Sequence, residues 1–470
     1  MIERKKHMKA RFAKVLGLAL ALALALSGCN LIEVDAKMQA DEDIAKLDKA
    51  YGVAAASYDG GEVTIGEAMG DFNSSYNQTN YMYYYYFGYQ MTESDVRMLA
   101  EDVLRQHVRA EVVAAKFDEA NSLSDEELAQ VEADAQSYYE SARASALESA
   151  EGKDDAARAE SARVLLRQSG MDYESFYANL LTSAKEDKME EILRGEIAEL
   201  SDEELQAAYD AKVAEQEESY TDGSSFESAM SSDDAIVCWQ PDGYRAVKHI
   251  LLIPDSEIKT AYTDAVSALE SARSDLDDLA AELEAAEDDE VQENERSAEE
   301  VQAEIDAIET TLPGLETAVK TAEKACLDDV KDKTDEIYKK LEAGENFEDL
   351  IAEYGEDPGM KNEPTATRGY CVSAASTNWE TNFRDAAMAL HQVGDYTAEP
   401  VVSGSGVHII QYTADVLGGK VDLKEVRDAL YAETLEETQN QHCEDTISAW
   451  VDGVNASYDV DAFMAAFAEE

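Results

Sequence analysis

Basic residues are scarce in this chain. Its 470 residues include 39 Lys and Arg against 102 Asp and Glu, which gives a formal net charge of −63. Such a negative field repels nucleic acid and anionic lipid headgroups, so we expect neither as a partner. The field would attract basic proteins or cations, although acids that only solvate long helices would give the same composition.

Long apolar runs are also scarce, and the clearest one, over residues 15–26, follows a basic segment over residues 4–14. This run is too short to span a bilayer as a permanent helix, so residues 1–28 are predicted to be a secretory signal peptide. The adjoining Leu26-Ser27-Gly28-Cys29 resembles the lipobox of bacterial lipoproteins. The resemblance implies a lipid on Cys29 that anchors the protein to the extracytoplasmic face of the cell membrane. A plain signal peptide that is cut nearby is the alternative.

Cysteine is the third scarce residue type. The five cysteines, Cys29, Cys238, Cys326, Cys371 and Cys443, show neither a CxxC spacing nor a zinc-ligand pattern. No EF-hand loop, phosphate-binding loop or G-x-S-x-G nucleophile motif occurs either. We therefore expect no metal and no cofactor. An exported compartment permits one or two disulfides, but we expect none, with Cys238 and Cys371 as small core residues.

Apolar residues make up 45% of the chain, which excludes wholesale disorder and permits more than one core. From residue 68 to about residue 209 they recur at helical spacing, and Ser-x-x-Glu signatures mark helix starts. Residues 215–234 lose this periodicity and are rich in Ser, Gly and Asp, which indicates a linker. The sequence thus predicts a helical domain that ends near residue 234.

One segment of the helical region is unusually aromatic, since residues 81–89 read Tyr-Met-Tyr-Tyr-Tyr-Tyr-Phe-Gly-Tyr. Such a cluster offers an adaptable apolar surface for unfolded client proteins, because each tyrosine ring supplies both area and a polar group. The alternative is a helical turn that packs against the β-hairpin expected within residues 53–67.

Two short aliphatic segments, residues 244–253 and 404–412, each contain one histidine, His249 and His408. Their β-branched residues predict buried strands. Between them, residues 343–357 read Ala-Gly-Glu-Asn-Phe-Glu-Asp-Leu-Ile-Ala-Glu-Tyr-Gly-Glu-Asp and follow a predicted helix. In this order the segments resemble a parvulin-type peptidyl-prolyl isomerase, which opens on a strand ending His-Ile-Leu and closes on Gly-Tyr/Ile-His-Ile-Ile. The resemblance implies an antiparallel sheet with helices, and catalysis of cis–trans isomerisation at X-Pro bonds.

The resemblance also implies site residues, each by its match to the family pattern. The implied catalytic residues are the paired central histidines, the acid beside the substrate carbonyl and the hydroxyl of the last strand: His249, His408, Asp357 and Ser405. The implied substrate-binding residues are the proline-socket aromatic, the residue at a usual Met position and a small socket residue: Phe383, Trp379 and Cys371. A purely structural role for the two histidines stays open.

The chain departs from the family pattern in its loops. The family's Gly-Gly-Asp-Leu-Gly is replaced by Arg368-Gly369-Tyr370-Cys371-Val372, and Gly355-Glu356-Asp357-Pro358 replaces Ser-x-Asp-Ser. Trp379 is also large enough to fill part of the socket. We expect the fold to tolerate these changes. For activity two interpretations remain, an isomerase or a non-enzymatic holdase whose parvulin domain only binds.

Residues 256–327 interrupt the parvulin-like region after its first strand. Apolar residues recur there in steps of three, four and seven, which predicts a coiled-coil-like helical hairpin with its tip near residues 287–297. Pro313 is expected to kink or break the return arm. The hairpin can serve as a client arm, as a passive spacer, or as a self-association handle in an envelope scaffold.

The flanks resemble SurA/PrsA-type foldases in a loose match of a strand, a Gly60-Gly61 turn and a Val-Thr-Ile helix entry. An amphipathic helix over residues 421–450 fits the family's C-terminal helix, which returns to the chaperone domain. The predicted fold class is therefore α+β, with a discontinuous helical chaperone domain and an interrupted parvulin-like sheet. The predicted segments are signal peptide 1–28, tether 29–60, chaperone domain 61–234 with 420–470, isomerase domain 235–255 with 328–415, and insertion 256–327.

Together these resemblances imply a bacterial, lipid-anchored foldase on the extracytoplasmic face of the membrane. Its expected partners are unfolded or partly folded secreted proteins that contain X-Pro bonds.

Overall fold

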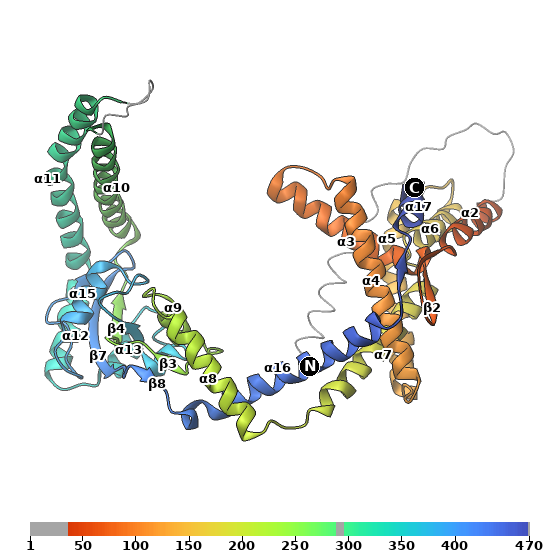
Figure 1. The fold of residues 1–470 in the computed structure, drawn as a ribbon. Coiled ribbons are helices and arrows are strands. Elements are labelled where there is room, and N and C mark those ends of the chain that lie inside the picture. Colours follow the sequence, from red (N-terminus) through yellow and green to blue (C-terminus); the bar gives the residue numbers. More distant parts are fainter. Residues whose placement is uncertain (1–35, 288–295, 469–470) are drawn as a thin grey trace. The chain divides into compact units, whose positions relative to one another are not determined.

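The structure is a computed structural model that describes residues 36–287 and 296–468. The predicted signal peptide, Cys29 and most of the predicted hairpin tip lie outside the described residues. The chain forms two compact units, Met1–Glu199 with Leu435–Glu470 and Leu200–Thr434, and each is described by itself. The predicted α+β class is confirmed, because helices dominate and the strands form small antiparallel sheets (Figure 1). In the described ranges, no helix combines the length and apolar character needed to cross a membrane.

The first unit is mostly helical and contains one small sheet of strand order β2-β1-β9. Its helices are α2 (Ala36–Tyr51), α3 (Ile65–Phe87), α4 (Glu93–Asp118), α5 (Asp125–Ser149), α6 (Asp155–Gln168), α7 (Tyr173–Glu196) and α17 (Val460–Ala468), with the last part of α16 (Leu423–Asp452). Its strands are β1 (Ala54–Tyr58), β2 (Gly61–Thr64) and β9 (Ser457–Tyr458). Capping boxes at Thr64, Thr92 and Ser124 begin α3, α4 and α5 by satisfying free backbone N–H groups.

The two ends of the chain share the core of this first unit. Strand β9 pairs with β1 through Ala56 and Tyr458. Phe463 of α17 is fully buried, and its ring lies edge-on to Phe72 of α3 with centroids 5.0 Å apart. The C-terminal segment is therefore an integral part of the N-terminal unit.

The N-terminal tether predicted over residues 29–60 differs from the observed structure. Helix α2 and strand β1 occupy residues 36–51 and 54–58, and Tyr51 is buried in the same core as Phe72. The sequence predicts a linker that runs into a helix in this range, and a β-hairpin over residues 53–67, but its domain bounds leave both in the tether up to residue 60. In the structure the helix already begins at Ala36.

The second unit contains the four-stranded sheet β5-β4-β7-β6 and a two-stranded sheet β3-β8 (Figure 1). Its strands are β3 (Trp239–Gln240), β4 (Arg245–Leu252), β5 (Tyr370–Val372), β6 (Val401–Val402), β7 (Val407–Asp415) and β8 (Gly419–Lys420). Its helices are α8 (Asp202–Ser219), α9 (Ser225–Met230), α10 (Ser256–Glu287), α11 (Ala298–Asp329), α12 (Lys331–Glu342), α13 (Phe347–Tyr354), α14 (Thr365–Arg368), α15 (Thr381–Ala389) and the start of α16.

The boundary between the units also differs from the prediction. Helices α8 and α9 group with the second unit rather than with the first. In the predicted linker, α9 buries Phe226 and Glu227, and Phe226 packs in a cluster with Cys371 of β5. This short helix caps one face of the four-stranded sheet, because its aromatic ring supplies the apolar cover.

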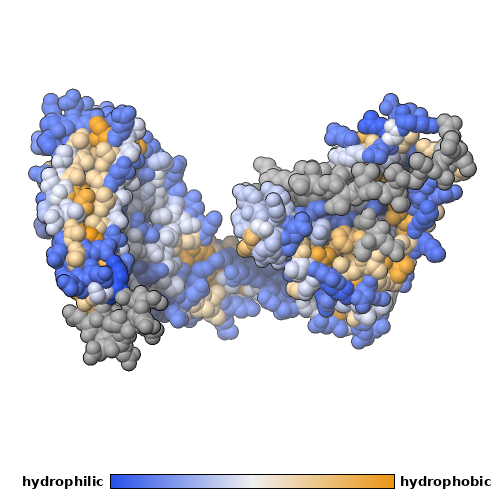
Figure 2. Space-filling view, turned by 90° about the horizontal axis from the view of Figure 1, so that it is seen from above, coloured by the Kyte–Doolittle hydropathy of each residue, from blue (hydrophilic) through white to orange (hydrophobic). Residues whose placement is uncertain are grey.

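The insertion forms two long helices, α10 and α11, which pack along each other. Leu269, Leu279 and Val301 are buried in their seam, while most of the other seam residues are half-buried. Figure 2 shows apolar surface along this hairpin between hydrophilic edges. The predicted break at Pro313 does not occur, since α11 runs through it. Pro313 is exposed, so water can satisfy the carbonyl that loses its helical partner.

Candidate active site

Two histidines lie side by side on the central strands of the four-stranded sheet. The register sets His249 opposite Ile410 and Leu251 opposite His408, so the histidines are diagonal neighbours on one face. Their Nδ1 atoms are 2.8 Å apart, and their stacked rings have centroids 4.9 Å apart. Both side chains are buried. A direct hydrogen bond therefore joins the two imidazoles.

Asp357 continues this hydrogen-bond chain beyond His249. It lies in the loop after α13, and its Oδ2 is 2.7 Å from His249 Nε2. The Tyr370 hydroxyl donates to the same oxygen at 3.0 Å, and the Gly359 N–H donates to Oδ1 at 2.9 Å. Burial alone would raise the pKa of Asp357, but these hydrogen bonds outweigh it and lower the pKa to about 2. Asp357 is therefore a carboxylate at neutral pH.

Ser403 continues the chain beyond His408. It precedes a two-residue turn between β6 and β7, in which Ser403 N–H donates to the Gly406 carbonyl at 2.8 Å. Its Oγ is 2.7 Å from His408 Nε2 and accepts a hydrogen bond from Ser405 N–H at 3.0 Å. In the bond with the Ser405 N–H the Ser403 oxygen only accepts, so the hydroxyl proton of Ser403 is free to be donated to His408 Nε2.

The fixed donors and acceptors orient every proton in this chain when each imidazole carries one proton. The Asp357 carboxylate only accepts, so His249 Nε2 donates to it. His249 Nδ1 then accepts from His408 Nδ1, and His408 Nε2 accepts from Ser403. Burial, and next the neighbouring His249, hold the pKa of His408 well below its usual range, which keeps this imidazole neutral.

Three aromatic rings lie against the histidine pair. Phe383 of α15 is edge-on to both imidazoles, with centroids 5.3 Å from His249 and 5.1 Å from His408. The Trp379 ring lies 5.4 Å from Phe383 and 4.7 Å from Tyr370. Trp379 Nε1 donates to a backbone carbonyl, that of Cys371, at 2.9 Å, which holds the indole in place. Phe383 is only 4% exposed, whereas Trp379 is half-buried, so the indole forms the outer part of this aromatic wall.

The structure brings five of the seven predicted site residues together, namely His249, His408, Asp357, Phe383 and Trp379. It does not bring the side chains of Ser405 and Cys371 to them. Ser405 is exposed in the turn and adds only its backbone N–H. Cys371 is buried in a separate cluster with Phe226, Val237 and Tyr244. Successive side chains of β5 point to opposite faces, so Tyr370 and Val372 face the histidine side and Cys371 faces away.

Two residues of the hydrogen-bond chain, Tyr370 and Ser403, were missed by the sequence prediction. For Tyr370 the signal was Gly369, the one glycine kept from the family's Gly-Gly-Asp-Leu-Gly, because it leads directly into the strand that Tyr370 begins. Gly369 has φ +77°, and a Cβ there would lie 2.6 Å from the Val247 carbonyl, so only glycine leads into β5 this close to β4. For Ser403 the signal was the pair of glycines, Gly404 and Gly406, that turn the chain back toward His408.

The remaining polar chemistry of the described residues gives no metal site. Within these ranges no group of three or more His, Cys, Asp or Glu side chains is placed to hold an ion. Cys238, Cys326, Cys371 and Cys443 are buried free thiols, and burial raises the pKa of Cys371 to about 12. These thiols are therefore unreactive at neutral pH.

Comparison with known proteins gives the class of this domain. Residues 315–414 match the family model of the rotamase, or PPIC-type PPIase, domain. The chain therefore contains a parvulin-type peptidyl-prolyl isomerase domain, as its sequence predicts. The matched range begins within α11 and leaves out β4 with His249, which the hairpin separates from the rest in sequence. Pairing of β4 with β7 returns His249 to the domain in space.

Among solved structures, this chain is similar to the peptidyl-prolyl isomerase PrsA from two Bacillus species. For Bacillus anthracis PrsA the identity is 14%, with 74% of this chain and 96% of that chain covered and a TM-score of 0.17. For Bacillus cereus PrsA the identity is 16%, with 82% of this chain and 95% of that chain covered and a TM-score of 0.18. For a structure of SurA-like chaperones from Campylobacter jejuni the identity is 14%, with 72% of this chain and 96% of that chain covered and a TM-score of 0.22. No curated protein matches the chain significantly.

Proposed function

We propose that this protein is an extracytoplasmic foldase whose parvulin-type domain isomerises X-Pro bonds of secreted proteins. The observation that carries this proposal is the buried chain Ser403–His408–His249–Asp357 against an aromatic wall. Ser403 is only 3% exposed, so its hydroxyl is not available as a nucleophile, which favours an isomerase over a hydrolase. This hydrogen-bond chain instead holds the negative charge of the Asp357 carboxylate at a fixed place.

The chemistry of the proposed reaction needs only such fixed groups. Rotation about an X-Pro bond faces a barrier of about 18–20 kcal/mol from amide resonance, and lowering it by about 7 kcal/mol gives roughly 10⁵-fold acceleration. The carbonyl oxygen is more negative in the planar amide than in the twisted one. A carboxylate beside that oxygen, here Asp357, therefore destabilises the planar ground state more than the transition state. Phe383 and Trp379 would hold the proline ring.

The proposed location and partners rest on the sequence. The predicted signal peptide and the lipid on Cys29 would place both units outside the cell membrane, where secreted proteins emerge unfolded. The first unit would act as the chaperone part and hold these clients. Self-association through residues 256–327 in an envelope scaffold remains an alternative use of the hairpin.

The activity is tested by exchange NMR on a short Ala-Pro peptide with the full chain. We expect the wild-type protein to accelerate cis–trans exchange, and Phe383→Leu to lower kcat/KM about tenfold because the proline ring loses its flat contact. Trp379→Met, which opens the outer wall, is expected to keep or raise the rate. No acceleration by the folded wild-type protein with several residues before proline would overturn the enzyme proposal.

One observation favours a second candidate, a holdase whose parvulin domain only binds. The large Trp379 ring lies against Phe383 and is held there by its hydrogen bond to the Cys371 carbonyl. If Trp379 blocks the proline ring, the wild-type protein is inactive while Trp379→Met gains exchange activity. That pair of results would assign the domain to binding rather than catalysis.

The aromatic segment of α3 is the best candidate for a client surface in the first unit. Tyr81, Tyr84, Tyr85, Tyr86 and Phe87 are 53–66% exposed, so the alternative of packing against the β1–β2 hairpin is not what the structure shows. Residues 72–92 contain no charged side chain, although 30% of the chain is charged. An exposed uncharged aromatic surface of this kind indicates an interaction site. We propose that it binds apolar segments of unfolded clients.

Replacement of Tyr84, Tyr85 and Tyr86 by Ser is expected to weaken binding of a permanently unfolded, carboxymethylated protein about tenfold. The effect arises because three rings lose their contact area, while the thermal stability stays within a few degrees since the side chains are exposed. Fluorescence anisotropy of the labelled client measures this affinity. Met98→Ser, at a 63% exposed position on α4, is the control. Equal affinity in the triple variant and the wild type would remove this surface from the client site.

A further inference from the structure

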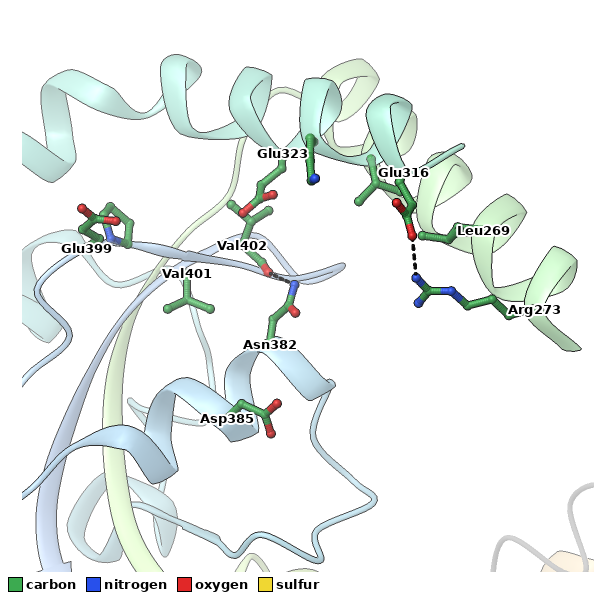
Figure 3. Close-up of a pocket in the computed structure, with 12 residues that line it drawn as sticks. Leu269, Arg273, Glu316, Glu323, Asn382, Asp385, Glu399, Val401 and Val402 are labelled. Atoms are coloured by element: carbon green, nitrogen blue, oxygen red, sulfur yellow. Dashed lines mark hydrogen bonds and ion pairs between the residues drawn. The ribbon is translucent and has the colours of Figure 1, made fainter. Parts of the chain in front are cut away.

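A groove lies at the base of the hairpin, where α10 and α11 meet α15 and β6 (Figure 3). Its volume is about 650 Å³, within the range of pockets that bind small ligands or short peptide segments. Leu269 of α10, Val319 of α11 and the segment Pro400–Val402 supply its apolar part. The groove therefore exists only because the insertion stands beside the edge strand of the parvulin-type sheet.

Unpaired charge in the groove is mainly negative. Arg273 is engaged by Glu316 at 3.2 Å, as Figure 3 shows, and Asp385 pairs with Arg384 at 3.0 Å. The side chains of Glu323 and Glu399 line the groove and form no hydrogen bond or ion pair with any described residue. Among the basic residues of the groove, Lys320 is likewise unpaired. Acids thus exceed bases among the groups that are free to meet a ligand.

The groove and the histidine site share their walls. On α15, Phe383 faces the histidines while the adjacent Asn382 lines the groove and donates to the Val402 carbonyl at 3.2 Å. Val401 lines the groove and also packs in the cluster that contains Phe383.

The turn that holds Ser403 is tied to the same region. Glu380, just before α15, accepts the Gly404 N–H with both carboxylate oxygens, at 2.9 and 2.8 Å. A Cβ at Gly404 would lie 3.5 Å from the Thr263 methyl group of α10. The base of the hairpin, the turn and the histidine chain are therefore contiguous.

We propose that this groove binds the client segment next to the proline and selects an apolar residue with a lysine or arginine beside it. The apolar side chain lies on Val319 and Val401, and the cation meets Glu323 and Glu399. The proposal rests on the proposed function, because the site next door must hold the proline. The net charge of −63 agrees with a preference for basic clients.

The test uses labelled peptides in which one Ala-Pro core is flanked on both sides by Leu-Lys, Leu-Glu or Leu-Ala. For the full chain, fluorescence anisotropy is expected to give about threefold to tenfold tighter binding of the Lys peptide than of the Glu peptide, the size of one or two exposed ion pairs. In Glu323→Gln/Glu399→Gln the preference falls to within about twofold, and in Glu323→Lys/Glu399→Lys it reverses. Binding of the Leu-Ala peptide stays unchanged in the Gln variant.

Glu284→Gln/Glu309→Gln is the matched control, since it removes the same charge from exposed hairpin positions outside the groove. The control is expected to keep the preference for Lys. Loss of that preference in the control would assign it to the general field, and absence of a preference in the wild type would remove the groove from client recognition; either result overturns the proposal. The affinities decide this question even without catalysis, whereas exchange NMR on the same peptides separately tests the isomerase.

Discussion

Asp357→Asn is expected to lower kcat/KM for X-Pro isomerisation at least about 100-fold while the protein remains folded. The variant keeps the shape of the side chain but removes the charge that we place beside the substrate carbonyl. An electrostatic group of this kind commonly contributes about 10²–10³-fold. The variant also leaves a donor unmatched, because His249, Tyr370 and Gly359 all donate to the carboxylate. We expect a loss of about 1–3 kcal/mol in the free energy of unfolding.

Tyr370→Phe separates these two effects. It removes one hydrogen bond to Asp357 but leaves the carboxylate charged and still bonded to His249 and Gly359. We expect kcat/KM to fall only a few-fold, because the charge remains in place. The rates come from exchange NMR, and circular dichroism confirms folding. An Asp357→Asn protein that is folded and retains activity within about threefold of the wild type would exclude an electrostatic role for this carboxylate.

The strand segments of the site were predictable from sequence because their signal is local. Residues 245–252 and 407–415 form β4 and β7, and His249 and His408 lie in these strands as the sequence predicts. Their diagonal contact depends on register, which the hydrophobic pattern sets by requiring Ile250 and Leu252 to face the core. The contact of Asp357 with His249 joins residues 108 positions apart, and only the family resemblance suggested it.

The two misplaced residues show where local patterns fail. A shift of one residue along β5 exchanges the faces of Tyr370 and Cys371, and the short strand offers too few residues to fix the register from sequence. The turn at Gly404-Ser405 resets the alternation between β6 and β7, so Ser403 rather than Ser405 meets His408.

Long-range pairing explains the other differences. Strand β1 pairs with β2 beside it in sequence and also with β9, where Ser57 lies opposite Ser457, 400 residues later. Helix α9 over residues 225–230 is likewise held by distant residues, because Phe226 packs with Tyr244 and Cys371. Neither long-range interaction leaves a periodic signal in its own segment. The predicted tether therefore extended to residue 60 although a hairpin was expected there, and residues 215–234 were assigned to a linker.

The buried histidine pair predicts that acid destabilises the isomerase domain. An unfolded histidine binds a proton near pH 6.5, whereas folded His408 has a pKa well below that value because it is buried beside His249. Between the two pKa values the unfolded chain binds more protons, so the free energy of unfolding falls as pH falls below about 6.5. For one such group the loss is at most about 2 kcal/mol at pH 5. Asp357, with its pKa lowered to about 2, adds a further loss only below about pH 4.

The measurement is urea unfolding at pH 7.5, 6.0 and 5.0, followed by the fluorescence of Trp379 alone. The chain has three tryptophans, so Trp239→Phe and Trp450→Phe leave the indole of the site as the single reporter. His408→Gln removes the titrating ring and is expected to be less stable at pH 7.5. Its free energy of unfolding should then lose less than that of the parent between pH 7.5 and 5.0, by up to about 2 kcal/mol.

The comparison of variants matters because a second effect has the opposite sign. Protonation of surface carboxylates reduces the self-repulsion of a chain with net charge −63, which favours the folded state as pH falls. That contribution is the same in the parent and in His408→Gln, so the difference between their pH profiles isolates the histidine. Parallel profiles for the two proteins would show that His408 takes up its proton without cost in the folded state. The neutral hydrogen-bond chain from Ser403 to Asp357 would then be wrong.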